Sequence, residues 1–184
     1  MEDRDTKGKI VKEAFPSEIV SIIGDILAGV VLTVLILPFK SFILLILIIP
    51  ALLSLRGNLS GPFIARTSRD FIIGEFNKNT LIQNILATYS LAIITGFLIG
   101  ILSFFLDIFL IRLDLIPWHS ILFIPVISIS LTLLISIPCS TMLNYIAFKN
   151  GLDPNNVVNP IMTAVDDFLT VINFFITLLI MGVP

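Results

Sequence analysis

Long apolar runs dominate the sequence and limit the folds that it can adopt. A helix needs about 20 mostly apolar residues to cross the hydrocarbon core of a bilayer. Several such runs follow one another here, and 57% of the 184 residues are hydrophobic whereas only 13% are charged. A soluble domain usually carries about 25% charged residues. The sequence therefore predicts an all-α, multi-pass integral protein of the cell membrane, embedded in the lipid bilayer, and excludes a water-soluble enzyme or a disordered chain.

We expect five transmembrane helices, over about residues 17–37, 41–76, 81–111, 118–148 and 154–183. Residues 1–14 are expected to form a short cytoplasmic tail, and residues 15–184 the transmembrane domain. The second helix is expected to be broken near residues 56–61, because its apolar part ends after 15 residues, or about 22 Å. Non-helical backbone at membrane depth is tolerated only where it is buried in protein or lines a wet cavity, so the break also suggests a function.

The basic residues predict the orientation of these helices. Lys and Arg accumulate on the cytoplasmic side of membrane proteins, and with five spans nine of the eleven share one side. The N-terminus is therefore expected to be cytoplasmic and the C-terminus outside. The nine are Arg4, Lys7, Lys9, Lys12, Arg56, Arg66, Arg69, Lys78 and Lys149, against Lys40 and Arg112 on the other side.

Several kinds of function are excluded by composition. One cysteine, Cys139, and one histidine, His119, leave no disulfide framework, iron–sulfur cluster or Cys/His metal site within one chain. The net charge of −2 gives no sign of nucleic-acid binding. No nucleophile–base pair or metal-hydrolase motif is present, so an enzyme is not expected.

The last span carries a polar stripe. Asn159, Thr163 and Asp167 are four residues apart and share one face of a helix. Asp167 lies 13 residues after Pro154, about 20 Å along the axis and close to the middle of a bilayer. An ionisable group at that depth usually marks a pathway or an ion pair. Arg56 is the nearest candidate for a paired basic residue.

Two further acids leave alternatives open. Asp166 lies about 100° around the helix from Asp167, and the sequence does not decide whether it faces a path or a second helix. Asp25 lies within the first span and either lines a path or pairs with a basic residue. Both are possible coupling groups for a second ion.

The available ligands favour a hard divalent cation. Carboxylate, amide and hydroxyl oxygens suit Mg²⁺, Mn²⁺ or Ca²⁺, and Mg²⁺ typically keeps several waters and meets one or two carboxylates. Five short spans do not easily enclose an aqueous path, whereas a two-fold homodimer builds one at its axis from the same helix used twice. One Asp167 from each subunit would then match a largely hydrated Mg²⁺.

Two segments resemble a known family. Residues 50–61 (PALLSLRGNLSG) resemble the second-helix signature of the MgtE magnesium channel family, in particular its eukaryotic solute-carrier relatives. Residues 151–160 (GLDPNNVVNP) and 163–167 resemble the fifth-helix signature of the same family. The resemblance extends over about residues 15–184.

The resemblance implies an Mg²⁺ path at a homodimer axis, lined by the second and fifth helices. It places the ion-binding aspartate at Asp167, the polar positions of the fifth helix at Asn159 and Thr163, and the Gly-Asn of the second helix at Gly57 and Asn58. Arg56 resembles the basic residue before Gly-Asn in the solute-carrier relatives. Bacterial members carry a large cytoplasmic sensor and the eukaryotic relatives two membrane units, so a half-length homodimer without sensor gating is expected.

The sequence therefore predicts a transporter or channel for divalent cations, above all Mg²⁺. A Na⁺- or H⁺-coupled exchanger of divalent cations is the first alternative, and a non-transporting membrane scaffold subunit is the second. Selectivity among Mg²⁺, Mn²⁺ and Ca²⁺ and the direction of flux are left open.

Overall fold

The computed structural model describes residues 6–112 and 115–184, without the side chain of Phe42. Within these residues the chain forms five long helices and no strand. Each helix is long and apolar enough to cross a membrane, which confirms the five expected helices. They are α1 (Lys7–Ile36), α2 (Phe42–Ile73), α3 (Lys78–Leu106, extended by a π-helical turn over Asp107–Ile111), α4 (Trp118–Lys149) and α5 (Pro154–Ile180).

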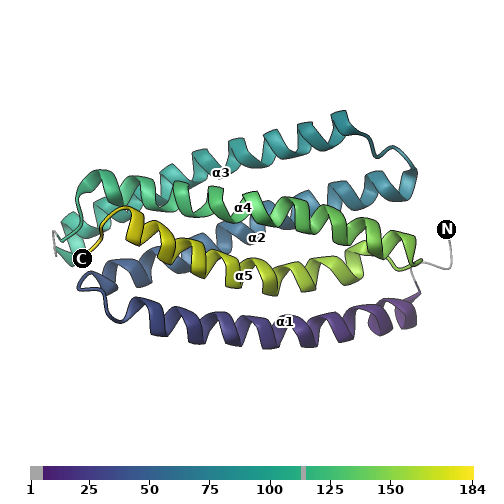
Figure 1. Cartoon of the computed structure of the whole chain (residues 1–184), viewed down its shortest axis with the longest axis horizontal. Coiled ribbons are helices and arrows are strands. Elements are labelled where there is room, and N and C mark those ends of the chain that lie inside the picture. Colours follow the sequence, from purple (N-terminus) through teal and green to yellow (C-terminus); the bar gives the residue numbers. More distant parts are fainter. Residues whose placement is uncertain (1–5, 113–114) are drawn as a thin grey trace.

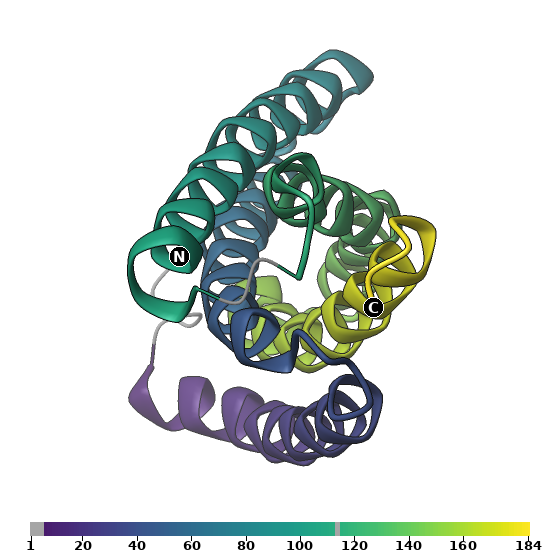
Figure 2. The ribbon, with the colours of Figure 1, turned by 90° about the vertical axis from the view of Figure 1, so that its left-hand side faces the viewer.

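The helices run up and down along one common direction, with the two chain ends at opposite ends of the bundle (Figure 1). Helices α2, α4 and α5 pack around a shared apolar core, in which Leu52, Phe63, Leu133 and Phe174 are at most 1% exposed. Helix α3 packs outside α2 and α4. Helix α1 lies at the edge of the bundle and packs almost entirely against α5 (Figure 2).

The predicted break in the second helix is wrong, because α2 is one continuous helix from Phe42 to Ile73. Pro62 removes a single backbone donor, the one that would bond to the carbonyl of Asn58. The glycines there cost about 1 kcal/mol each relative to Ala. The opposite face of the helix is buried and packs against the core. Leu59 and Phe63 on this face are 4% and 1% exposed, respectively. Tertiary packing thus outweighs the local preference for a break.

Helix α1 begins at Lys7, about ten residues before the expected first span. The stretch expected as a tail is therefore helical from that residue onward. Its Glu13 carboxylate accepts hydrogen bonds from the backbone N–H of Asp153 and from Nδ2 of Asn156, at 3.3 and 3.2 Å. Ser17 donates to the carbonyl of Asn156 at 3.2 Å. The polar first turns of α1 are thus joined to the start of α5.

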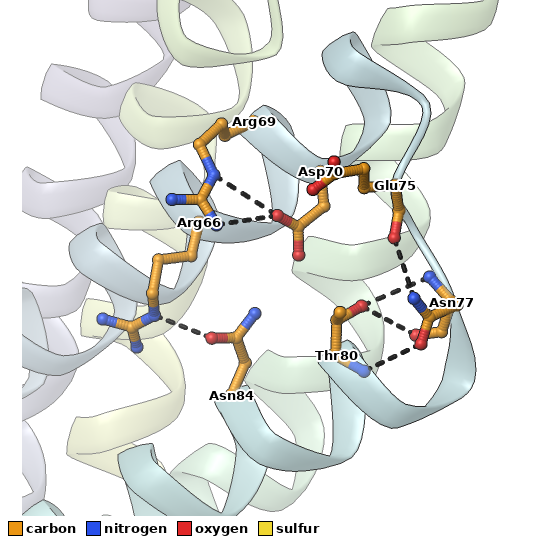
Figure 3. A network of polar contacts seen from close by, with 7 residues as sticks. All are labelled: Arg66, Arg69, Asp70, Glu75, Asn77, Thr80 and Asn84. Carbon is orange, nitrogen blue, oxygen red and sulfur yellow. Dashed lines mark hydrogen bonds and ion pairs between the residues drawn. The ribbon is translucent and has the colours of Figure 1, made fainter.

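A polar network holds the turn between α2 and α3 (Figure 3). Gly74 ends α2 in the left-handed conformation, with φ 75°, which a residue without Cβ adopts at little cost. Asn77 and Thr80 then form a reciprocal capping box at the start of α3. Arg66 on α2 donates to Oδ1 of Asn84 on α3 at 2.9 Å and ties the two helices together one turn further in.

Close approach of α3 and α4 depends on two glycines. A Cβ on Gly96 would lie 3.2 Å from the Cα of Val126, and one on Gly100 would lie 2.6 Å from the carbonyl oxygen of Leu122. Small residues at four-residue spacing let helix backbones approach in membranes. The Gly-x-x-x-Gly motif is therefore a packing face within the subunit.

We expect Gly100→Ala to destabilise the bundle, since the new methyl group meets backbone atoms of Leu122 that cannot rotate away. Overpacking of this kind typically costs about 1–3 kcal/mol. Thermal unfolding in detergent measures the loss, with Gly29→Ala as the matched control because a Cβ there has no neighbour within 4 Å. Equal melting temperatures for the two variants would contradict the packing role.

Candidate cation site

Helix α5 begins as the sequence predicts. The Asp153 side chain accepts a hydrogen bond from the backbone N–H of Asn155 at 2.9 Å, and Pro154 follows in the first turn. Both residues favour the start of a helix, because the carboxylate satisfies a free backbone donor and proline lacks one. The start of α5 fixes the register of the polar residues that follow along the helix.

Asp167 forms an ion pair with Arg56, in which Nη2 of the arginine on α2 donates to Oδ1 of the aspartate on α5. The Arg56 side chain is 6% exposed and the Asp167 side chain is 17% exposed. Asp167 lies 13 residues into α5 and Arg56 lies 14 residues into α2, so each is about 20 Å from its helix start. The pair therefore lies in the middle of the bundle, where a charge needs a partner.

Asp166 points into the interior and is 0% exposed. Ser136 on α4 and Ser60 on α2 lie beside its carboxylate, yet neither of its two oxygens has a hydrogen-bond donor in the structure. Ser60 instead donates to the backbone carbonyl of Arg56 at 3.0 Å. A buried carboxylate without a donor is costly as an anion, so this position needs a further cation, proton or water.

Asp25 adds a third carboxylate at the same level of the bundle. It lies on α1 beside Asp167. Its Oδ2 is 3.5 Å from the hydroxyl of Ser21, and its buried Oδ1 has no donor. Among the residues that the structure describes, Arg56 is the one basic side chain in this group. Three ionised carboxylates and one guanidinium would leave two negative charges uncompensated in the middle of the bundle.

The remaining predicted ligands lie on an outer face of the subunit. Gly57 and Asn58 on α2 are exposed, as is Asn159 on α5, while Thr163 is half-buried. Oδ1 of Asn159 lies 3.8 Å from the position of a Cβ on Gly61, so the polar faces of α2 and α5 are neighbours. Thr163 donates its hydroxyl to the backbone carbonyl of Asn159 at 2.9 Å, which leaves the hydroxyl oxygen free to accept.

The structure thus divides the predicted site into two parts. Arg56, Asp166, Asp167 and Asp25 come together inside the subunit, whereas Gly57, Asn58 and Asn159 line its surface. Asp167, partly exposed on the same helix as Asn159, belongs to the first group and borders the second. In residues 6–112 and 115–184 no three His, Cys, Asp or Glu side chains form a ready-made metal site.

Sequence reasoning missed the serines that face Asp166. Ser60 lies on α2, whereas Ser136 belongs to a buried polar stripe on α4 with four-residue spacing, opposite the buried side of α5. Asn173 on α5, for example, donates to the hydroxyl of Thr132 on α4 at 3.3 Å. The regular four-residue spacing of these polar residues in the sequence could have indicated a buried polar face on α4. The stripe consists of Ser128, Thr132, Ser136, Ser140 and Asn144.

Comparison with known proteins identifies the family. A model of the MgtE family, described as a divalent cation transporter, matches residues 49–177, well over half of the chain. The chain belongs to the MgtE family. The matched region runs from α2 through α5 and so includes every position that the resemblance assigned, from Arg56 to Asp167, whereas Asp25 on α1 lies outside it. Membership of MgtE together with five membrane-crossing helices makes the chain a multi-pass membrane protein of a divalent cation transporter family, not of an enzyme family. No characterised protein and no solved structure matches the chain closely enough for comparison.

Proposed function

We propose that this protein moves Mg²⁺ across the membrane as a homodimer, with the ion path at the two-fold axis and lined by α2 and α5. Asp167 binds the ion, and Asn159, Thr163 and Asn58 hold its shell of water. The N-terminus is cytoplasmic and the C-terminus outside. Mn²⁺ and Ca²⁺ use the same oxygen ligands.

The grouping of three mid-bundle carboxylates around a single basic side chain, among the residues that the structure describes, is the observation that carries this proposal. Arg56 compensates one of three mid-bundle carboxylates, and an uncompensated charge at that depth costs several kcal/mol. A divalent cation approaching the partly exposed Asp167 supplies the missing positive charge. Because ion and guanidinium then share one carboxylate, the ion is held weakly enough to leave again, as conduction requires.

The exposed polar face of α2 and α5 supports the dimer. Asn58 and Asn159 present amide groups at membrane depth, where lipid offers no hydrogen bond. The face around them consists of small residues such as Gly57, which allow a second helix to approach closely. A second copy of the chain places two such faces opposite each other and encloses water between them.

Coupled exchange is a second candidate, favoured by one specific observation. Asp166 is fully buried and lacks a donor on both oxygens, and Asp25 lacks one on its buried oxygen. Carboxylates in this condition are natural binding groups for Na⁺ or H⁺ that move in exchange for the divalent ion.

Flux into liposomes tests both candidates with the full chain. Uptake of Mg²⁺ that persists after Na⁺ and proton gradients are collapsed is expected for a channel-like path. Uptake that stops under these conditions would support exchange instead. Absence of Mg²⁺ uptake under either condition, from protein that is folded by size-exclusion chromatography, would contradict the proposed function. Competition by Mn²⁺ and Ca²⁺ in the same assay measures selectivity.

A further inference from the structure

A groove on the outside of the subunit runs between α1 and α5 and is separate from the site described above. Its first part is a cavity of about 740 Å³ near the start of both helices. Its second part, of about 450 Å³, continues toward the middle of the bundle. Val20 and Ile161 line both parts, so the two are adjacent, and we call them together the α1/α5 groove.

The two ends of the α1/α5 groove differ in chemistry. Lys9 and Lys12 line the end near the chain's N-terminus. Lys12 is exposed, and Lys9 lies 3.9 Å from Glu13, whose other oxygen already accepts from the start of α5. The inner end is apolar and carries exposed side chains, among them Leu27 at 55% and Phe168 at 39% exposure.

The length of the groove matches one leaflet of a bilayer. Taking the level of Asp25 and Asp167 as the midplane, Lys12 lies 13 residues earlier on α1, about 20 Å away. The hydrocarbon core extends about 15 Å from its midplane, so the lysines lie at the height of the lipid headgroups. Leu27 lies two residues beyond Asp25, so the apolar end reaches the depth of the acyl-chain termini.

We infer that the α1/α5 groove binds one anionic glycerophospholipid, with its phosphate between Lys9 and Lys12 and an acyl chain along Val20, Ile161 and Phe168. A basic end at headgroup height and an apolar end at chain depth fit this amphiphile in a single orientation. Helix α1 makes few contacts other than those with α5. The bound lipid therefore lies along the contact between α1 and α5 that holds α1 to the bundle. The same contact brings Asp25 beside Asp167.

The headgroup charge and the acyl chain make separate contributions to lipid binding, and each can be measured. A basic residue near an anionic surface typically strengthens lipid binding about five-fold. Glu13 offsets one of the two lysines at this end of the groove, so we expect about five-fold preference for an anionic over a zwitterionic headgroup. This preference should decrease as salt is raised, because exposed charges are screened. The contribution of the acyl chain should not depend on salt.

The test compares dioleoyl phosphatidylglycerol with dioleoyl phosphatidylcholine on the purified full chain in detergent. Native mass spectrometry is expected to retain phosphatidylglycerol about five-fold more strongly, and the lipid should raise the melting temperature. Lys9→Gln/Lys12→Gln should lose this preference while melting normally in phosphatidylcholine. The matched control Lys40→Gln/Lys149→Gln, with lysines outside the groove, should keep it. Glycerol phosphate, which has the headgroup charge without the chains, should give no shift.

Four results would overturn the assignment. The first is equal retention of the two lipids by the wild type, and the second is full preference in Lys9→Gln/Lys12→Gln. The third is retention unchanged by Val20→Trp, which fills the groove at the junction of its two parts; Val11→Trp, at an exposed α1 position outside the groove, controls for the added ring. The fourth is an equal rise in melting temperature with glycerol phosphate, which would show that the lysines bind a free anion rather than a lipid.

Discussion

Replacement of Asp167 by asparagine is expected to reduce Mg²⁺ flux into liposomes at least ten-fold. The amide keeps the shape of the side chain but removes a partly exposed negative charge that borders the polar face of α2 and α5. A ten-fold loss corresponds to about 1.4 kcal/mol, which is modest for a charged ligand in a poorly solvated position.

The loss must be separated from a loss of folded protein, since the variant leaves Arg56 without its ion-pair partner. Asp166 lies close enough to interact with that guanidinium, so we expect Asp167→Asn to remain folded. Glu18→Gln is the matched control, because it also removes one carboxylate but at an exposed position of α1. Flux per folded protein that is the same in Asp167→Asn and in the control would contradict the role of Asp167.

Replacement of Arg56 by glutamine should produce the largest change in stability. Removing one partner of a buried ion pair typically costs about 3–5 kcal/mol, and here it leaves three carboxylates at one level with no basic side chain among the described residues. Thermal unfolding in detergent measures the loss. Arg66→Gln on the same helix is the control, because its partners Asn84 and Thr88 are neutral.

The Arg56→Gln variant should also respond to Mg²⁺ more strongly than the wild type. The guanidinium and the ion share Asp167 in our proposal, so removing the guanidinium gives the ion a free carboxylate. Ligands that bind only the folded state raise its stability. The double variant Arg56→Gln/Asp167→Asn removes both partners and should regain part of the lost stability. If Arg56→Gln is as stable as the wild type and Mg²⁺ does not change its melting temperature, the Arg56–Asp167 pair is not part of the ion-binding site.

Features that depend on local sequence were predictable in this chain. The length of the apolar runs predicts the five helices, and Asp153 followed by Pro154 predicts where α5 begins. The four-residue spacing of Gly96 and Gly100 is a local pattern typical of close helix contacts in membranes, although only the structure identifies α4 as the partner. These features require a few neighbouring residues and no knowledge of how distant segments meet.

Features that depend on packing between distant segments were not predictable. The local sequence of residues 57–62 favours a break, and only the core contacts of the opposite face of α2 keep it helical. The pairing of Arg56 with Asp167 joins positions 111 residues apart, so it depends on the relative register of two helices. The sequence names Arg56 as a candidate but leaves the pair undecided. The position of Ser136 beside Asp166 depends on a third helix in the same way.

Isothermal titration of Mg²⁺ into the purified protein tests the central claim most directly, which is that Asp167 binds the transported ion. The titration compares the wild type with Asp167→Ala and with the control Glu18→Gln in the same detergent. The account predicts at least ten-fold weaker Mg²⁺ binding for Asp167→Ala and unchanged binding for the control. Mg²⁺ affinity that is unchanged in folded Asp167→Ala would contradict it.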